Sequence, residues 1–437
     1  MYLKLTAATL LFGVSTFATA VPTHDKFIAI VRPACPVRLG GIFTMGLGAS
    51  DNPFTNTAQK GETISKDNMR WIENNCDVIG LTPAVLKPDD YSIIRQKAPN
   101  FTPLLYLYAS CLYQSPYPGS VGGWDSNMAA CTLRHANGKE VHYPDPGGHW
   151  MAFGSKRWAI HWIKAANQLA STYNAAGVIA SELPVNNTFV SDVPKADQSF
   201  AARVAATTRW LQAAAPLRKT MLIPAALNFD RPVGHPTLPP PVADSQPNLQ
   251  GTLWDEEYPL MDGGWDEGWI CPYWKGKPVD DEQWNEQEEA LDRYGRDGEV
   301  FIAAAAYHNL HELEYALASY LLVVHHQGRA VFQPMPLIPG VRSDAGYSIQ
   351  TLRQQVKKYP GYFNVTLGWP YQVRHLVPDG DASVWSRRFG GGTVYVNSTN
   401  THTIKVVLGS PMRRLSGKLT SEVVLPPHSG AVLLTVQ

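Results

Sequence analysis

Between about residues 40 and 340, short apolar runs alternate with longer segments whose apolar residues recur every three or four positions. The first pattern is typical of buried β-strands and the second of amphipathic helices. Helical segments include 66–75, 155–173, 195–217, 280–295 and 308–328. Strand segments are found at 41–46, 77–81, 103–109, 177–183, 220–226, 251–257, 300–307 and 330–336. Because eight alternating βα units build a closed parallel sheet, the sequence predicts an α/β fold, a (β/α)8 TIM barrel.

The pattern changes after about residue 365. Short alternating segments at 382–389, 391–399, 403–408 and 430–437 predict a small antiparallel β-domain. A chain of 437 residues is also longer than most single domains. We therefore expect a signal peptide at 1–20, a catalytic barrel at 21–364 and a β-sandwich-like domain at 365–437.

The N-terminal stretch has the features of a secretory signal peptide. A lysine near the start precedes an apolar run that ends in Ala-Thr-Ala at Ala20. We therefore expect an exported, extracellular protein, in which some of the five cysteines pair. Cys111 and Cys131 are the most local pair. If the chain is glycosylated, its sequons predict exposed positions at Asn100, Asn186, Asn364 and Asn397.

Composition excludes several function classes. The formal net charge is zero and charged residues make up 17%, so no basic surface for nucleic acid or an anionic membrane is expected. No GxSxG elbow, P-loop or HExxH motif occurs. We expect no cofactor and no catalytic metal, and a monomer. Aromatic residues make up 11%, and flat apolar rings suit the faces of sugars.

Acids follow two of the predicted strands. Glu182 ends strand four, and Asp255, Glu256 and Glu257 end strand six. Strand ends of this kind meet at the C-terminal mouth of a barrel, where barrel enzymes have their active sites. Side-chain alternation turns Glu256 inward, with Asp255 and Glu257 as substitutes. For each acid alone the alternative is structural, because acids after a strand often cap a helix or bind an arginine.

Other residues near the strand ends are candidates for substrate binding. Trp265 and Trp269 are the strongest candidates for platforms under a sugar, whereas paired tyrosines in a strand often only pack and a lone histidine is more often structural. Asp262 and Asp266 favour turns or a loop-bound cation. Long intervals at 110–153 and 228–250 predict functional loops on the same face. The candidates for substrate binding are Tyr106, Tyr108, Trp254, Trp265, Trp269, Tyr307 and His308.

The order of these features resembles a barrel-type glycoside-hydrolase-like family, secreted and with a C-terminal β-domain. The similarity lies in "WIENNCDVIGL", "PLLYLYA", "HWMAFGSKRWAIHWIKAANQLASTYNAAGVIASE", "GTLWDEEYP" and "GGTVYVNST…LPPHSGAVLL". The resemblance implies that acids at the strand ends are catalytic. By analogy with α-galactosidase-type barrels, it implies Glu182 as nucleophile and Glu256 as acid/base. The chain departs from the family pattern where Ser181 replaces an expected Asp, and where Ala176 and Gln250 precede the strand glycines.

These features together predict a glycoside hydrolase that acts on a poly- or oligosaccharide. Two carboxylates would serve as proton donor and as nucleophile or base, about 5–5.5 Å apart for retention and 6.5–9.5 Å for inversion. The alternative is a non-catalytic carbohydrate-binding or cell-wall protein on an enzyme-like barrel. A lyase or a transferase that uses the same pocket is a further alternative.

Overall fold

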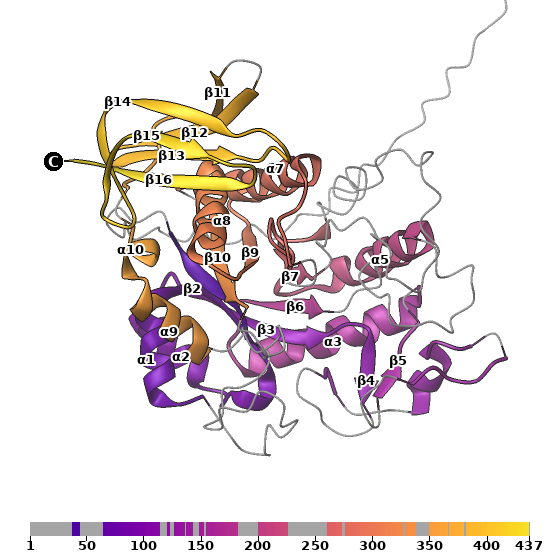
Figure 1. Ribbon diagram of the computed structural model, residues 1–437. Coiled ribbons are helices and arrows are strands. Elements are labelled where there is room, and N and C mark those ends of the chain that lie inside the picture. The colour runs from indigo at the N-terminus through magenta and orange to yellow at the C-terminus, as the bar shows by residue number, and fades with distance from the viewer. Residues whose placement is uncertain are drawn as a thin grey trace, which may run out of the picture. The chain divides into compact units, whose positions relative to one another are not determined.

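The structure is a computed structural model (Figure 1). It describes residues 37–43, 64–113, 120–122, 126–135, 137–142, 148–152, 154–181, 200–225, 260–272, 276–326, 328–337, 349–365, 367–379 and 382–436. All of them belong to one compact unit of the chain. None of the helices in these ranges is both long enough and apolar enough to span a membrane.

The larger sheet is an eight-stranded parallel barrel (Figure 1). Its strands follow one another around the ring in chain order, and β1 pairs with β10. Between β7 and β8, the Asp262 amide donates to the Leu222 carbonyl at 3.0 Å, and the Leu222 amide donates to the Asp262 carboxylate at 2.9 Å. This contact closes the ring, so the predicted (β/α)8 barrel is confirmed. The strands are β1 (Leu39–Phe43), β2 (Cys76–Leu81), β3 (Thr102–Tyr108), β6 (Gly177–Ser181), β7 (Met221–Pro224), β8 (Gly263–Asp266), β9 (Val300–Tyr307) and β10 (Arg329–Pro336).

The sixth strand corrects the sequence prediction. The predicted range, 251–257, lies outside the described residues, and β8 occupies the sixth place between β7 and β9. A Cβ at Gly263 would lie 2.1 Å from the Val300 carbonyl oxygen, so only glycine allows this approach. The sequence "GGWD" has no apolar run, and sequence patterns therefore favour a turn there.

Each helix that follows a strand covers the outside of the barrel. Four of them begin with a side chain that caps backbone N–H groups, namely Ser65, Ser155, Asp280 and Asn309. Helix α7 ends at Gly298, whose φ of 76° is a left-handed C-cap. The helices are α1 (Lys66–Asn75), η1 (Pro83–Val85), α2 (Asp90–Lys97), η2 (Ser126–Cys131), α3 (Lys156–Thr172), α5 (Phe200–Ala214), η4 (Ala215–Leu217), α7 (Asp281–Asp297), α8 (Leu310–Val323), α9 (Ile349–Lys358) and α10 (Pro360–Phe363).

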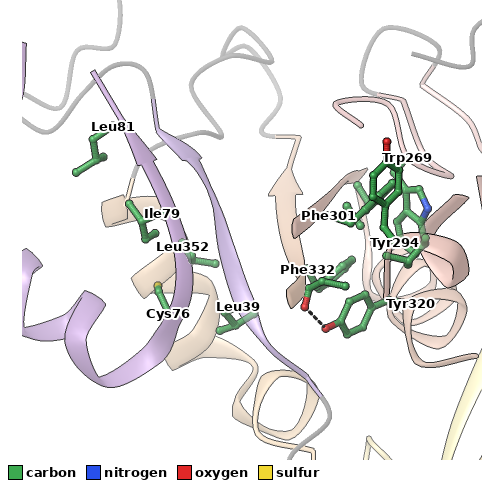
Figure 2. Packing of buried hydrophobic residues seen from close by; sticks show 14 of the residues in the cluster. Leu39, Cys76, Ile79, Leu81, Trp269, Tyr294, Phe301, Tyr320, Phe332 and Leu352 are labelled. Carbon is green, nitrogen blue, oxygen red and sulfur yellow. Dashed lines mark hydrogen bonds between the residues drawn. The ribbon is translucent and has the colours of Figure 1, made fainter. Parts of the chain in front are cut away.

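Two apolar layers lie on opposite faces of the strands. The outer layer, between strands and helices, includes Ile79, Phe301 and Phe332 (Figure 2). In this layer the Tyr320 hydroxyl donates to the Ala330 carbonyl at 3.0 Å. The inner layer fills the barrel and includes Val78, Leu104, Tyr106, Ile179, Ile223, Trp265, Ile302 and Val331. Successive side chains of a strand point to opposite faces, which is why neighbours in sequence divide between the layers.

The interval at 110–153, predicted without regular structure, contains a short antiparallel pair. Strand β4 (Cys111–Tyr113) pairs with β5 (Gly148–Trp150), and the segment around Thr132 pairs with the other edge of β5 at Met151. Strand β5 therefore separates Cys111 from Cys131 by two strand spacings, or roughly 9–10 Å. A disulfide needs Cα atoms within about 7 Å. Cys111 and Cys131 are both buried and no disulfide joins them, so the predicted pairing is wrong.

The C-terminal residues form a six-stranded antiparallel sheet, in agreement with the predicted β-domain. Two strands, β11 and β15, escaped prediction because their side chains are mostly exposed. A sequon fails here: Asn397 is 0% exposed and donates to the carbonyls of His402, Leu425 and Pro426, so it cannot be an exposed glycan acceptor. The strands are β11 (His375–Asp379), β12 (Ala382–Phe389), β13 (Gly392–Asn397), β14 (Ile404–Arg414), β15 (Leu419–Leu425) and β16 (Ser429–Thr435).

Candidate active site

The C-terminal ends of β3 and β6 place polar groups inside the barrel. Tyr106 and Tyr108 lie on the inner face of β3, in register with Ile179 and Ser181 of β6. The Ser181 hydroxyl donates to the Tyr106 hydroxyl at 2.6 Å. Both residues are buried, with 3% of Ser181 and 6% of Tyr106 exposed. The sequence indicated the two tyrosines as candidates, and the structure places both on the inner face of β3; their role in substrate binding stays a prediction.

Trp265 extends this group to the other side of the ring. It lies on the inner face of β8, and its ring centroid is 6.1 Å from that of Tyr106, in an edge-on arrangement. Tyr106 contacts Tyr108 in the same way at 5.5 Å. The buried Trp265 Nε1–H has no hydrogen-bond partner within the described ranges. We call Tyr106, Tyr108, Ser181 and Trp265 the mouth cluster.

Trp269 does not belong to the mouth cluster. It is 0% exposed and lies in the outer layer, where its ring packs edge-on against Phe332 at 6.4 Å (Figure 2). Its predicted role as an exposed platform for sugar is therefore wrong, because four positions after the inward Trp265 the chain has left β8 and turned toward α7. Asp266 also faces outward and accepts from Gln287 at 3.0 Å, while Asp262 closes the ring. Among the described residues, neither belongs to a group of His, Cys, Asp or Glu side chains that could hold a metal ion.

Tyr307 and His308, at the end of β9, are not brought to the mouth cluster either. The Tyr307 hydroxyl donates to Gln355 of α9 at 3.0 Å, and burial raises the pKa of this phenol. The His308 amide and ring Nδ1 both contact the Glu312 carboxylate, at 2.6 and 3.0 Å. Glu312 also accepts from the Asn309 side chain, so these residues form the N-terminal cap of α8. These contacts favour the structural alternative for both positions, and their roles in substrate binding stay predictions.

The predicted catalytic acids lie outside the described residues. The acids are Glu182, which directly follows Ser181, and Asp255, Glu256 and Glu257. The predicted substrate-binding residue Trp254 also lies outside the described residues. Their proposed roles stay predictions. Within the described ranges, no three His, Cys, Asp or Glu side chains lie close enough together to hold a metal ion.

Ser181 is the site residue that sequence reasoning missed. It entered only as a departure from an expected Asp at the end of strand four. Its inward position was readable from the sequence, because Ile179 and Ser181 share the inner face of the strand while Val178 and Ala180 lie in the outer layer. What the sequence could not show is that the hydroxyl meets Tyr106 of the neighbouring strand.

Comparison with known proteins gives matches to solved structures only. No family model matches, and no curated protein matches. An α-amylase from Geobacillus thermoleovorans, complexed with acarbose, is 12% identical, with 92% of this chain and 99% of that chain covered and a TM-score of 0.46. The maltogenic α-amylase AmyB from Thermotoga neapolitana is 9% identical, covers 92% and 98%, and gives 0.47. The glycoside hydrolase domain of PelA from Pseudomonas aeruginosa is 16% identical, covers 62% and 90%, and gives 0.36.

Proposed function

We propose that this protein is a secreted glycoside hydrolase that cleaves a poly- or oligosaccharide at the C-terminal mouth of its barrel. The observation that carries the proposal is the mouth cluster, in which two hydroxyls gather inside the barrel with the Trp265 indole N–H, which has no hydrogen-bond partner among the described residues. Glu182 follows the last residue of β6 directly in the chain. Strand alternation alone would turn position 182 to the face opposite Ser181, so the proposal requires that the chain leave the strand conformation there and bring the carboxylate to the mouth cluster.

The chemistry of the mouth cluster supports a sugar as ligand. Deeper in the barrel the inner layer is aliphatic, with Val78, Leu104 and Val331 among its members. Packing alone does not require hydroxyls, because apolar groups fill a core without unpaired donors. Aromatic rings suit the apolar faces of a pyranose, and hydroxyl and indole N–H groups can hydrogen-bond to its oxygens.

The proposed reaction uses two carboxylates. Glu182 would attack the anomeric carbon or activate water, and Glu256 would protonate the leaving oxygen, with Asp255 and Glu257 as substitutes for Glu256. In the non-catalytic alternative, the same acids would only accept hydrogen bonds from sugar hydroxyls. The two functions differ in bond cleavage, which is what the experiment must measure.

The test is release of reducing sugar from a panel of polysaccharides. We expect release from at least one glycan, and a loss of at least about 100-fold in Glu182→Gln and Glu256→Gln, because general acid–base and covalent catalysis each contribute about that much. Glu289→Gln is the matched control, since Glu289 is an exposed acid on α7. Unchanged release in both variants would refute the carboxylate pair, and binding without release by the wild type would favour the non-catalytic alternative.

Export is part of this proposal and has its own test. When the full chain is expressed in a secreting host, we expect the mature protein in the medium with its N-terminus directly after Ala20. N-terminal sequencing checks this cleavage site. Retention inside the cell with Met1 still attached would contradict the signal peptide.

A further inference from the structure

A polar groove lies on the outer helical ring, between α1 and α9. Its volume is about 270 Å³, and its lining residues are Asp67, Arg70, Trp71, Asn74, Asn75 and Arg353. None of these residues belongs to the inner layer of the barrel. The groove is thus separate from the mouth cluster and needs its own explanation.

One face of α1 supplies five of the six lining residues. They recur at spacings of three and four, which brings them to the same side of the helix. Asp67, Arg70 and Asn74 are exposed, while Trp71 is partly buried against the outer layer. The indole of Trp71 is therefore anchored by the core on one side and reaches the groove on the other.

The hydrogen bonds of the lining residues use some of their polar groups and leave others available to bind a ligand. Asn74 and Asn75 donate their amide N–H groups to the carbonyls of Arg70 and Trp71, at 2.9 and 2.8 Å. Their Oδ1 atoms are not used in these bonds and can accept from a hydroxyl. Arg353 donates one N–H to Asn68 at 2.5 Å, which fixes a guanidinium that has five donors in all.

Among the described residues, the three charged side chains that line the groove, Asp67, Arg70 and Arg353, form no ion pairs. Within the described ranges, neither Arg70 nor Asp67 takes part in an ion pair or a side-chain hydrogen bond. A groove that combines an aromatic platform, fixed acceptors and fixed donors matches the hydroxyl-rich, partly apolar surface of a sugar. Its volume of about 270 Å³ lies just below the typical range for ligand sites, which is about 300–1,000 Å³, so the ligand would be small or would bind only in part.

We propose that this groove is a second saccharide-binding site, in which Trp71 stacks on a pyranose face and Arg70, Asn74 and Arg353 bind its hydroxyls. The inference rests on the proposed function only for the choice of a glycan chain as ligand. Its role would be to hold a chain while another part of that chain occupies the mouth.

The experiment is affinity electrophoresis of the full chain through gels that contain a polysaccharide. One gel holds a neutral glucan and the other a uronic-acid polymer. Both polymers carry hydroxyl groups, so the two gels show whether the groove prefers a neutral or an acidic sugar. We expect retardation of the wild type in at least one gel. Trp71→Ala should weaken this binding by at least about 10-fold, since stacking on one aromatic ring is worth on the order of 1.4 kcal/mol.

Two further variants make the result specific. Asn74→Ala changes an exposed residue, cannot disturb the core, and should weaken binding by a smaller factor of about 3–5. Tyr371→Ala is the aromatic control, because Tyr371 is 65% exposed and lies outside the groove. Equal melting temperatures of all variants would show that they are folded.

A short soluble oligosaccharide would occupy only the mouth, so its rate of hydrolysis measures the mouth without the second site. Trp71→Ala should cleave it within about twofold of the wild type, whereas Glu182→Gln should lose cleavage and keep the retardation. Retardation that depends on Trp71 without any hydrolysis would support the groove and refute the proposed enzyme. Absence of retardation in both gels, or equal retardation of Trp71→Ala and the wild type, would overturn the second site.

Discussion

The mouth cluster and the contact between the barrel and the β-domain both bury polar groups, but they use them differently. At the contact, Arg387 of β12 donates to the carbonyls of Leu321, Leu322 and Val324, at 3.2, 2.8 and 2.9 Å. These carbonyls belong to the C-terminal end of α8, where backbone C=O groups have no hydrogen-bond partner within the helix. In the mouth cluster, the buried Trp265 N–H has no partner at all in the described ranges.

The comparison gives Arg387 a structural role and leaves the Trp265 N–H open to a ligand among the described residues. Lack of a partner alone does not mark a site, because Trp269 Nε1 and Glu288 Oε1 have none there either. Arg387 satisfies a helix end and places a positive charge at the negative pole of its dipole. Burial lowers the pKa of Arg387 to about 10, so the residue stays charged at neutral pH. An unpaired buried donor such as the Trp265 N–H costs about 1–3 kcal/mol unless a ligand or water completes it. We expect substitutions at the contact to change stability and substitutions at the mouth to change function.

The largest expected effect is on activity. Glu182→Gln should lower kcat/KM by about 100-fold or more, which equals about 2.7 kcal/mol of transition-state stabilisation, and should leave the melting temperature within about 2 °C of the wild type. Kinetics on the glycan identified by the panel, with calorimetry of the same samples, measures both quantities. A variant that loses stability in proportion to activity would erase the contrast between the two regions.

The next effect is on stability. Arg387→Met should lower the free energy of unfolding by about 2 kcal/mol, because it removes a buried charge and leaves three helix carbonyls unsatisfied. Arg388→Met is the matched control, since the next residue of the same strand is exposed. We expect less than about 0.5 kcal/mol from it. Urea denaturation of both variants checks the difference, and equal losses would show that Arg387 does not anchor the β-domain.

A third prediction concerns pH at the same contact. Burial raises the pKa of Glu288 well above its ordinary value, and this outweighs the opposing charge of Arg374, whose Nη1 lies 3.5 Å from Glu288 Oε2. Because the native state holds this proton more tightly than the unfolded state, Glu288 stabilises the fold below pH 4.5 and this contribution is lost as pH rises toward its raised pKa.

Glu288→Gln removes this titration. We expect the wild type to lose more stability between pH 5 and pH 8 than the variant does, since each pKa unit corresponds to about 1.4 kcal/mol. Glu289→Gln, the exposed neighbour on α7, should follow the wild type. Chemical denaturation across this pH range measures the slopes. If Glu288→Gln and the wild type have the same slope, the buried acid is already ionised by its arginine.

The sequence predicted the barrel well where strands are long and apolar. Residues 300–307 form β9 with the predicted bounds, because eight consecutive buried residues give a clear signal. Prediction failed at β8, where two glycines allow backbones to approach and the apolar run is missing. The prediction of a Cys111–Cys131 disulfide also failed. Proximity along the chain does not show that a third strand, β5, lies between the two segments.

The candidate site was only partly readable. Alternation along a strand placed Tyr106 on the inner face, because that rule needs no partner. Trp265 and Trp269 looked equivalent in "DGGWDEGW", and only the end of β8 decides that the first faces the barrel interior and the second the helices. The Ser181 hydroxyl and its bond to Tyr106 join residues 75 positions apart, which no local pattern encodes.

The smallest expected effect is that of the Ser181–Tyr106 hydrogen bond on stability. A hydrogen bond between two neutral hydroxyls contributes about 1 kcal/mol, so Ser181→Ala and Tyr106→Phe should each cost about that much, and the double variant should cost clearly less than the sum. The same variants should weaken substrate binding more than stability, because the hydroxyls lie in the mouth cluster and bond to each other at 2.6 Å. Unfolding free energies and KM for the four members of the cycle test this. If the single variants lower stability by 3 kcal/mol with unchanged KM, the mouth cluster is a structural network like that around Arg387, and the reason to place a sugar there is lost.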